Sequence, residues 1–484
     1  MKIVKCISIF SWIMFFVLPI NLLAQDKEIP TTTSSKDALK YFLEGRDKNE
    51  DQDLVAAAAL FDKAIEKDSA FAMAYLYRSI SGGGDVVFRH NLEKAVSLAG
   101  KVTEGEKLEI FFCQAWTDGN TQKLNEIIDH LLKSFPSDKR VHALVGYYYY
   151  SMNDFSRALV QYQKSVKLDN SFATAYNMTG YCQSGLNNNP EAEKAIQTYI
   201  KLRPDKADPY NSYAELLLKM GKYDESVAQF KKALEKDPAF TNSLAGIGNT
   251  YIFKGDYKSA RKYYQDFFGK APDIDGKLYA LWLKAVSFVH EGKIDEAIRS
   301  LDERSALAKK ENKIPESIYS VADQRFIYTE NGNPVEGMNY CEKANGMIEK
   351  ANLSGTDKAS LEKSSTGWHI YNTIALGDID KAGVELEKYK QKYENMKQPV
   401  DEKEVNFYMG YSELKKGNYD KAIGYYSKAD TMQSPFNWYC IAVAYNKKGD
   451  KQNALKYFEK IARLNVNSLD LAIFRKRAMA ELKK

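Results

Sequence analysis

The side chains that most often bind metals or perform catalysis are few in this sequence and lie far apart. No two histidines have the spacing of a His-Glu-x-x-His motif or of any other metal site; the five are His90, His130, His142, His290 and His369. Residues 273–276 (DIDG) begin like a calcium loop, but the glycine comes two positions early and the closing Glu is absent. We therefore expect no metal ion and no cofactor.

Motifs for nucleophilic catalysis or phosphate binding are also missing. Residues 82–84 (GGG) lack the Gly-Lys-Ser/Thr that completes a phosphate-binding loop, which favours a flexible turn. The sequence has no Gly-x-Ser-x-Gly elbow. We predict that the protein is not an enzyme and has no catalytic residues.

Composition and charge restrict the class of partner. The chain has 484 residues, of which 44% are hydrophobic, and a formal net charge of +5. Its mean hydropathy of −0.48 excludes a polytopic membrane protein. A nearly balanced charge does not indicate nucleic acid or an anionic membrane as partner.

The N-terminus has the layout of a secretory signal peptide. Lys2 and Lys5 precede a short apolar run, 6–18, which ends before Pro19. We predict that residues 1–24 are removed, leaving no membrane span, and that residues 25–37 form a polar tether. The alternative is an uncleaved anchor. Because no Cys follows the run to accept a lipid, we expect export to the periplasm or else secretion.

The cysteines fit poorly with a disulfide framework. Four remain after the predicted cleavage, all far apart: Cys113, Cys182, Cys341 and Cys440. Two bridges are possible in an exported protein. Free cysteine is commonly buried as a small hydrophobic residue, and this second interpretation is favoured.

A period of 34 residues organises most of the chain. Small residues recur at this interval, namely Gly146, Gly180, Ala214 and Gly248, and large residues follow them, namely Tyr162, Ile196, Phe230 and Tyr264. In each period, apolar residues recur every three or four positions, a turn follows, and a second helical pattern begins. Four units without gaps, 139–274, are therefore predicted as antiparallel helix pairs.

The period and its residues resemble the tetratricopeptide repeat (TPR) family. Unit 207–240 supplies the family's large and small positions, which are Tyr210, Ala214, Leu217, Ser226, Phe230, Ala233 and Pro238. Unit 435–468 matches as well, except that Val466 stands where Pro is usual. The resemblance implies an all-α solenoid, a right-handed superhelix of antiparallel helix pairs. Flanking the regular units we expect degenerate repeats at 38–138, irregular ones at 275–402, further repeats at 403–468 and a capping helix at 469–484.

The resemblance also implies a concave groove lined by the first helix of each pair. At the groove positions we predict peptide-binding residues Tyr147, Asn177, Tyr181, Asn211 and Asn249, with Arg140, Tyr150, Glu215 and Asn242 beside them. Tyrosine and asparagine offer contact area and hydrogen bonds to an extended chain. The alternative is that the tyrosines pack between helices and the asparagines are merely solvated. One subtype of the family binds a C-terminal carboxylate through Lys, Asn and Arg residues on successive first helices. That pattern is absent from this sequence.

These observations favour a non-catalytic scaffold of the cell envelope or secreted space that holds a protein or extended peptide. One alternative is a helical accessory or carbohydrate-handling protein, which would need two facing carboxylates in its groove. Glu215 is the one groove acid that we can place, and it has no evident partner. A second alternative is a self-assembling structural solenoid. The oligomeric state stays open.

Overall fold

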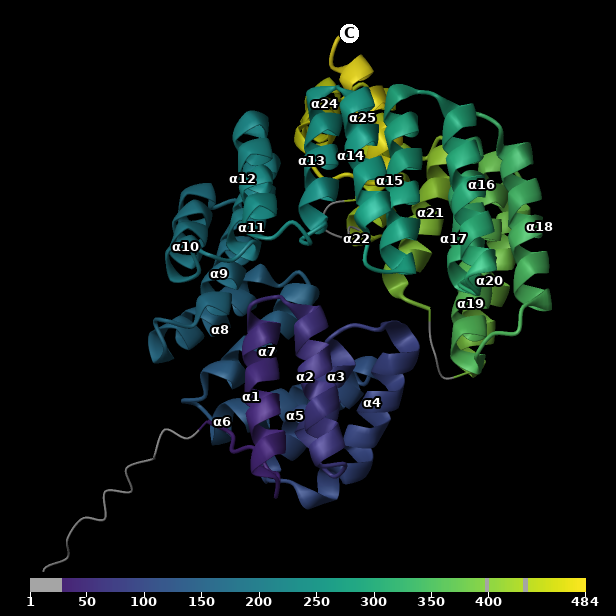
Figure 1. The fold of residues 1–484 in the computed structure, drawn as a ribbon. Coiled ribbons are helices and arrows are strands. Elements are labelled where there is room, and N and C mark those ends of the chain that lie inside the picture. The colour runs from purple at the N-terminus through teal and green to yellow at the C-terminus, as the bar shows by residue number, and fades with distance from the viewer. Residues whose placement is uncertain (1–27, 397–399, 430–433) are drawn as a thin grey trace, which may run out of the picture. The chain divides into compact units, whose positions relative to one another are not determined.

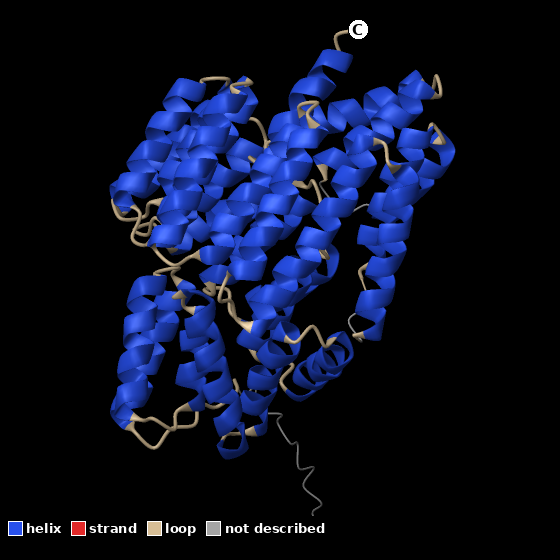
Figure 2. Ribbon diagram, turned by 90° about the vertical axis from the view of Figure 1, so that its right-hand side faces the viewer, coloured by secondary structure: helices blue, strands red, loops and turns tan. Residues whose placement is uncertain are grey.

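The computed structural model describes residues 28–396, 400–429 and 434–484, and in these residues it contains helices and no β-strand (Figures 1 and 2). Successive helices are joined by short turns into antiparallel pairs. The predicted all-α architecture of repeated helix pairs is confirmed. The predicted signal peptide, 1–24, lies outside the described residues.

The chain divides into two compact units, and the border between them crosses two helices. Unit 1 comprises the described residues up to 148 together with 160–172, and unit 2 comprises 149–159 and the chain from 173 onward. The border therefore falls within α7 (Lys139–Ser151) and α8 (Phe155–Leu168). The other helices of unit 1 are α1 (Lys36–Glu50), α2 (Leu54–Lys67), α3 (Ala72–Ile80), α4 (Gly84–Leu98), the short 3-10 helix η1 (Ala99–Lys101), α5 (Glu104–Thr117) and α6 (Thr121–Ser134).

Unit 2 begins with regular pairs and continues with longer helices. The regular part contains α9 (Ala173–Gly185), α10 (Asn189–Leu202), α11 (Asp208–Lys219), α12 (Tyr223–Lys236), α13 (Asn242–Lys254) and α14 (Tyr257–Lys270). The longer helices are α15 (Ile274–Glu291), α16 (Ile294–Lys310), α17 (Ile314–Glu330), α18 (Pro334–Lys350), α19 (Gly355–Leu376) and α20 (Ile379–Asn395). The units of this region are longer than 34 residues, and their additional residues lie in longer helices. The last helices are α21 (Glu402–Lys416), α22 (Tyr419–Ala429), α23 (Pro435–Lys447), α24 (Lys451–Arg463) and α25 (Leu469–Glu481).

Small residues allow the two helices of a pair to approach closely. A Cβ atom built on Gly180 would lie 2.5 Å from Cδ1 of Ile196, and one on Gly248 would lie 2.3 Å from Cε1 of Tyr264. Ile196 and Tyr264 are almost fully buried. The periodic small and large residues thus pack against each other within one pair.

The C-terminal helix α25 packs against several elements of unit 2. It contacts α23 and α24, which precede it, and also α15 and α17, which lie far away in the sequence. Leu471 and Phe474 are buried, and the Phe474 ring lies 4.9 Å from the ring of Phe436. α25 therefore does more than cover the last repeat, because it joins the end of the chain to helices in the middle of the unit.

Two further expectations concern cysteines and membrane spans. All four cysteines in the described residues are free, and three of them, Cys182, Cys341 and Cys440, are buried. The preference for free thiols over disulfides is confirmed. Within the part of the chain that the structure describes, no helix has the length and apolar character needed to cross a bilayer.

Candidate functional site

Unit 1 holds an extended segment of its own chain. Residues 28–34 belong to the segment predicted as a polar tether, and they lie against the helices of unit 1. The Ile29 N–H donates a hydrogen bond to Asp138 Oδ2 at 2.6 Å. The Thr32 N–H and hydroxyl donate to the two carboxylate oxygens of Glu106, each at 2.6 Å. Two buried carboxylates therefore bind backbone groups of this segment.

Side chains complete the docking of residues 28–34. Glu28 forms ion pairs with Arg140 at 2.9 Å and with Lys139 at 3.4 Å. Ile29 packs against Gly105, where an added Cβ atom would lie 2.8 Å from the isoleucine side chain. The cavity that remains beside the segment measures only about 20 Å³. Little space for a ligand is left at this place.

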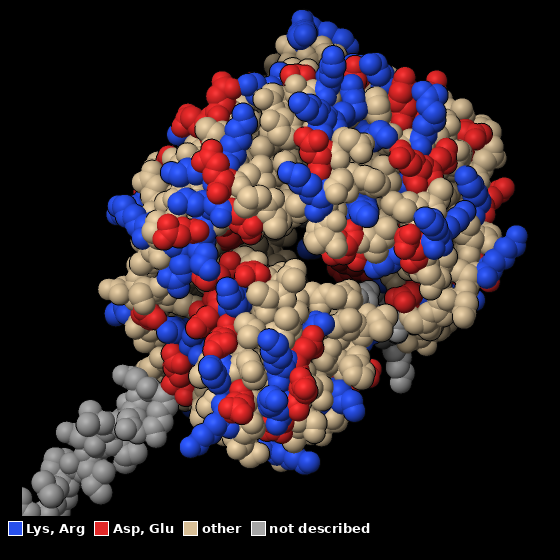
Figure 3. All heavy atoms as spheres, viewed as in Figure 1, with Lys and Arg blue, Asp and Glu red and all other residues tan. Residues whose placement is uncertain are grey.

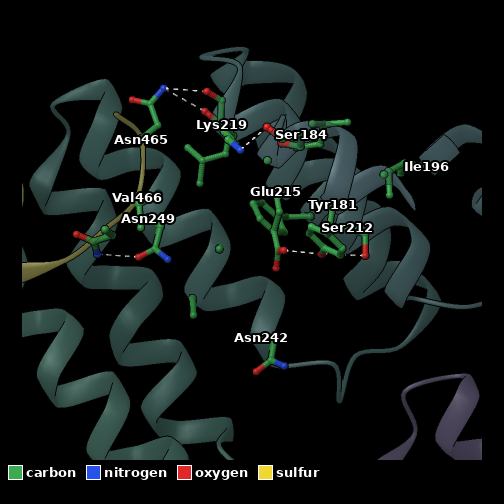
Figure 4. Close-up of a pocket in the computed structure, with 18 of the residues that line it drawn as sticks. Tyr181, Ser184, Ile196, Ser212, Glu215, Lys219, Asn242, Asn249, Asn465 and Val466 are labelled. Carbon is green, nitrogen blue, oxygen red and sulfur yellow. Dashed lines mark hydrogen bonds between the residues drawn. The ribbon is translucent and has the colours of Figure 1, made fainter. Parts of the chain in front are cut away.

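Unit 2 contains a much larger cavity of about 530 Å³, shown in Figure 4. The first helices of successive pairs, α9, α11, α13 and α15, contribute most of its wall, together with the end of α7. The loop 464–468 between α24 and α25 forms another side. The size lies within the range of ordinary ligand pockets. This cavity is the candidate binding site.

A carboxylate, Glu215, stands on the wall of the cavity. Its Oε2 accepts a hydrogen bond from the Tyr181 hydroxyl at 2.7 Å, and its Oε1 accepts one from Asn211 Nδ2 at 2.9 Å. The side chain is accessible to solvent, but the protein atoms around the cavity partly desolvate its carboxylate. This desolvation raises the pKa of Glu215, although the two hydrogen bonds oppose the shift.

No cation in the described residues forms an ion pair with Glu215. Lys219 also lines the cavity, one helical turn away, but its Nζ donates to the Ser184 carbonyl at 2.7 Å. Burial lowers the pKa of Lys219, and Glu215 does not offset this. The hydrogen bonds that Glu215 accepts therefore come from the neutral donors Tyr181 and Asn211.

Tyrosine rings border the same space. The rings of Tyr150 and Tyr181 lie 6.4 Å apart, and Tyr279 of α15 is 46% exposed. Burial raises the pKa of the Tyr279 hydroxyl, and the charge of Glu215 raises it further. The wall thus combines aromatic faces with one carboxylate.

The loop 464–468, which we call the C-terminal strap, binds the edge of the cavity through two asparagines. Asn465 Nδ2 donates to the carbonyls of Leu218 and Lys219, at 3.2 and 3.5 Å, and its Oδ1 accepts from the Tyr223 hydroxyl at 3.1 Å. Figure 4 shows Asn465 and Val466 beside the helices that line the cavity. The contact joins residues up to 247 positions apart in the chain.

The second asparagine of the strap binds a groove position predicted from the sequence. Asn467 Nδ2 donates to Asn249 Oδ1 at 2.8 Å and to the Tyr264 hydroxyl at 3.2 Å. Its Oδ1 faces His290 Nε2 at 3.1 Å. Burial lowers the pKa of His290 to about 4, with a smaller contribution from Arg475, so the ring is neutral and Nε2 carries the donated proton.

The other predicted groove residues have different surroundings. Asn177 and Asn211 are 8% and 6% exposed, and their amides bond to neighbouring helices, Asn177 to Asp208 at 3.4 Å. Asn211 Oδ1 accepts from Ser243 at 2.9 Å. Tyr147 belongs to unit 1, where its half-exposed ring lies 5.8 Å from that of Trp116. Of the five, Tyr181 and Asn249 line the cavity, and peptide binding by all five stays a prediction.

Sequence reasoning did not identify the strap. Asn465 and Asn467 lie at the end of the last predicted unit, 435–468, on either side of Val466. The one available signal was Val466, because it replaces the proline that usually ends a unit. That departure marks the segment which the structure uses to reach the cavity.

Glu215 is the one carboxylate among the residues that line the cavity, so the pair of facing acids expected for carbohydrate hydrolysis is not found there. In the described part of the chain, no group of three or more His, Cys, Asp or Glu side chains is arranged to hold a metal ion.

Comparison with known proteins finds tetratricopeptide repeats. One such family profile matches residues 183–240 and 212–268, and a second matches residues 437–466. The two matches of the first profile together cover α10 to α13 and most of α14, and residues of α10 to α13 line the cavity.

Similar proteins share only part of their length with this chain. Anaphase-promoting complex subunit 3 of Schizosaccharomyces pombe is 26% identical over 208 residues, which are 42% of this chain and 30% of that protein. Superkiller complex protein 3 of Homo sapiens is 29% identical over 161 residues, 32% of this chain and 10% of that protein. A solved tetratricopeptide repeat protein from Parabacteroides merdae has 15% identity and a TM-score of 0.36, covering 56% of this chain and 94% of its own. The chain thus spans less than a third of the two sequence relatives.

Proposed function

Because the chain is a tetratricopeptide repeat protein, we propose that it is a non-catalytic scaffold that holds an extended segment of a partner protein in the cavity of unit 2. One observation carries the proposal: first helices of successive repeats surround about 530 Å³ of space. Repeat proteins commonly bind partners along such a surface. By their names, both sequence relatives belong to protein complexes, which agrees with a scaffold.

The structure also offers an internal example of this kind of binding. The strap is an extended segment, and it is bound by residues of α11, α13 and α15 through its side-chain amides. A partner segment would lie beside the strap, where Tyr181, Glu215 and Asn242 line the free space. Aromatic side chains in a pocket often contribute most of the affinity.

A screen of random decapeptides against the full chain tests this proposal. We expect the selected peptides to lose more than tenfold in affinity with Tyr181→Ala, because an aromatic anchor contributes about 2 kcal/mol or more. Lys232→Ala on the outer helix α12 is the control, since Lys232 is exposed and does not line the cavity. Circular dichroism verifies that both variants are folded. Loss of binding with Lys232→Ala but not with Tyr181→Ala would place the site elsewhere.

We further propose that the scaffold acts outside the cytoplasm. The support is the signal-peptide pattern of residues 1–24, which predicts export to the periplasm or else secretion. Mass spectrometry of the protein from its native cells should find a new N-terminus near Gln25. An intact Met1 on the exported protein would instead indicate an anchor.

A further inference from the structure

We propose that the cavity of unit 2 receives a basic side chain, arginine or lysine, of the partner segment, with Glu215 as its counter-charge. This inference rests on the proposed function and specifies the chemistry of the ligand.

The partners of the Glu215 carboxylate favour a cationic ligand. Its two oxygens accept hydrogen bonds from neutral donors, Tyr181 and Asn211, and it has no ion pair in the described residues. On the outer surface, in contrast, basic and acidic side chains are interspersed over the face shown in Figure 3. Exposed charges elsewhere in the described chain form ion pairs, as Lys254 does with Asp224 and Lys448 with Asp420. A carboxylate in a recess without its own cation favours a cationic ligand.

The tyrosine rings that line the cavity favour the same kind of ligand. A guanidinium or ammonium group is attracted to the face of an aromatic ring within about 6 Å of its centre. The rings of Tyr150 and Tyr181 lie next to each other, and Tyr279 and Glu215 both line the cavity. Tyrosine faces and a carboxylate together recognise an organic cation by two independent attractions.

The nearest lysine does not block this arrangement. Lys219 lies four positions after Glu215 on α11, and its Nζ is held by the Ser184 carbonyl. It therefore occupies a different part of the wall. Asn242 is exposed at the start of α13 and can bind the backbone of the segment that carries the basic side chain.

Paired peptides test the inference with the full chain. Fluorescent peptides selected in the decapeptide screen are compared with versions in which each arginine is replaced by citrulline, a neutral side chain of the same shape. We expect the arginine peptides to bind at least tenfold more tightly. Glu215→Gln should remove this preference, while Glu235→Gln, an exposed glutamate on α12, should preserve it.

A second variant with reversed charge distinguishes a loss of the carboxylate from misfolding of Glu215→Gln. Glu215→Lys should reject the arginine peptides and bind versions with glutamate in place of arginine. Peptides that bind the cavity without any preference for a basic side chain would overturn this inference and leave the proposed function intact. Absence of any peptide binding to the cavity would overturn both. Acetyl-arginine amide binding as tightly as the peptides would show a small-cation site and contradict the role of a partner segment.

Discussion

Both units bind an extended segment of their own chain, but they do so by different chemistry. In unit 1, carboxylates of Glu106 and Asp138 accept hydrogen bonds from backbone N–H groups of residues 28–34. In unit 2, the strap is held by the side-chain amides of Asn465 and Asn467. The first mode uses groups that every residue except proline carries, and the second requires particular side chains.

The two modes also leave different amounts of space. Beside residues 28–34 the cavity is about 20 Å³, whereas about 530 Å³ stays open beside the strap. In unit 1 the segment fills the groove, because backbone contact brings it close to the helices. In unit 2 the asparagine side chains reach the helices from the edge. A bound segment of the chain can thus either close a groove, as in unit 1, or form one of its walls, as in unit 2.

The largest effect is expected from Glu106→Ala in unit 1. The change removes the acceptor of both Thr32 hydrogen bonds and the glutamate of the capping box that begins α5. Hydrogen bonds to charged groups contribute about 1.5–3 kcal/mol each, so we expect the free energy of unfolding to fall by about 3 kcal/mol or more. Hydrogen exchange should show loss of protection in residues 28–34. Glu104→Ala, on the exposed side of the same helical turn, is the matched control. Unchanged protection would mean that the carboxylate does not hold the segment.

A smaller effect is expected from Asn467→Ala in unit 2. This variant leaves the buried Tyr264 and the partly buried His290 with fewer hydrogen bonds, at a cost of about 2 kcal/mol. Protection against hydrogen exchange should fall in the strap and in α25, and stay unchanged in unit 1. Asn446→Ala, an exposed asparagine on α23, provides the comparison. An equal loss of protection in Asn467→Ala and Asn446→Ala would mean that the hydrogen bonds of Asn467 do not stabilise unit 2.

Acidification should also loosen the strap selectively. Because burial lowers the pKa of His290 to about 4, the unfolded chain takes up a proton before the folded chain does. The contribution of neutral His290 to the free energy of unfolding is fully present above a pH of about 6.5. It decreases as the pH falls toward 4, by about 1–2 kcal/mol between pH 7 and 5. Urea unfolding of unit 2 at several pH values measures it. His290→Gln keeps a donor for Asn467 and should reduce this slope, and an unaltered slope would exclude His290 as its origin.

The smallest effect is expected from Thr32→Val, which tests the backbone mode directly. The variant loses the hydroxyl hydrogen bond to Glu106 but keeps the one from the backbone N–H. We expect a loss of about 1 kcal/mol or less, and retained protection of the Thr32 amide in hydrogen exchange. Release of the whole segment would show that unit 1, like unit 2, depends on a particular side chain.

Equivalent repeat positions show how far the sequence could predict the site. Tyr147, Tyr181, Glu215 and Asn249 follow each other at 34-residue intervals, so the sequence predicts one row along the groove. In the structure Tyr181 donates to Glu215, while Asn249 binds the strap. Asn177 and Asn211, also one period apart, are buried. Periodicity predicts where a side chain lies in its repeat. Its hydrogen-bond partner depends on which other segment of the folded chain faces that position.

The sequence by itself determined the helix pairs and their close packing. Small residues such as Gly180 and Gly248 recur once per repeat, and local spacing is enough to predict that two helices approach closely there, whereas the structure shows that Ile196 and Tyr264 are the side chains they meet. Only the tertiary structure decided which part of the groove is open. That outcome depends on Asn467 returning to Asn249 across 218 residues and on Ile29 reaching Asp138 across 109. The physical reason is that such contacts arise from the path of the whole chain, and no local pattern of residue types records that path.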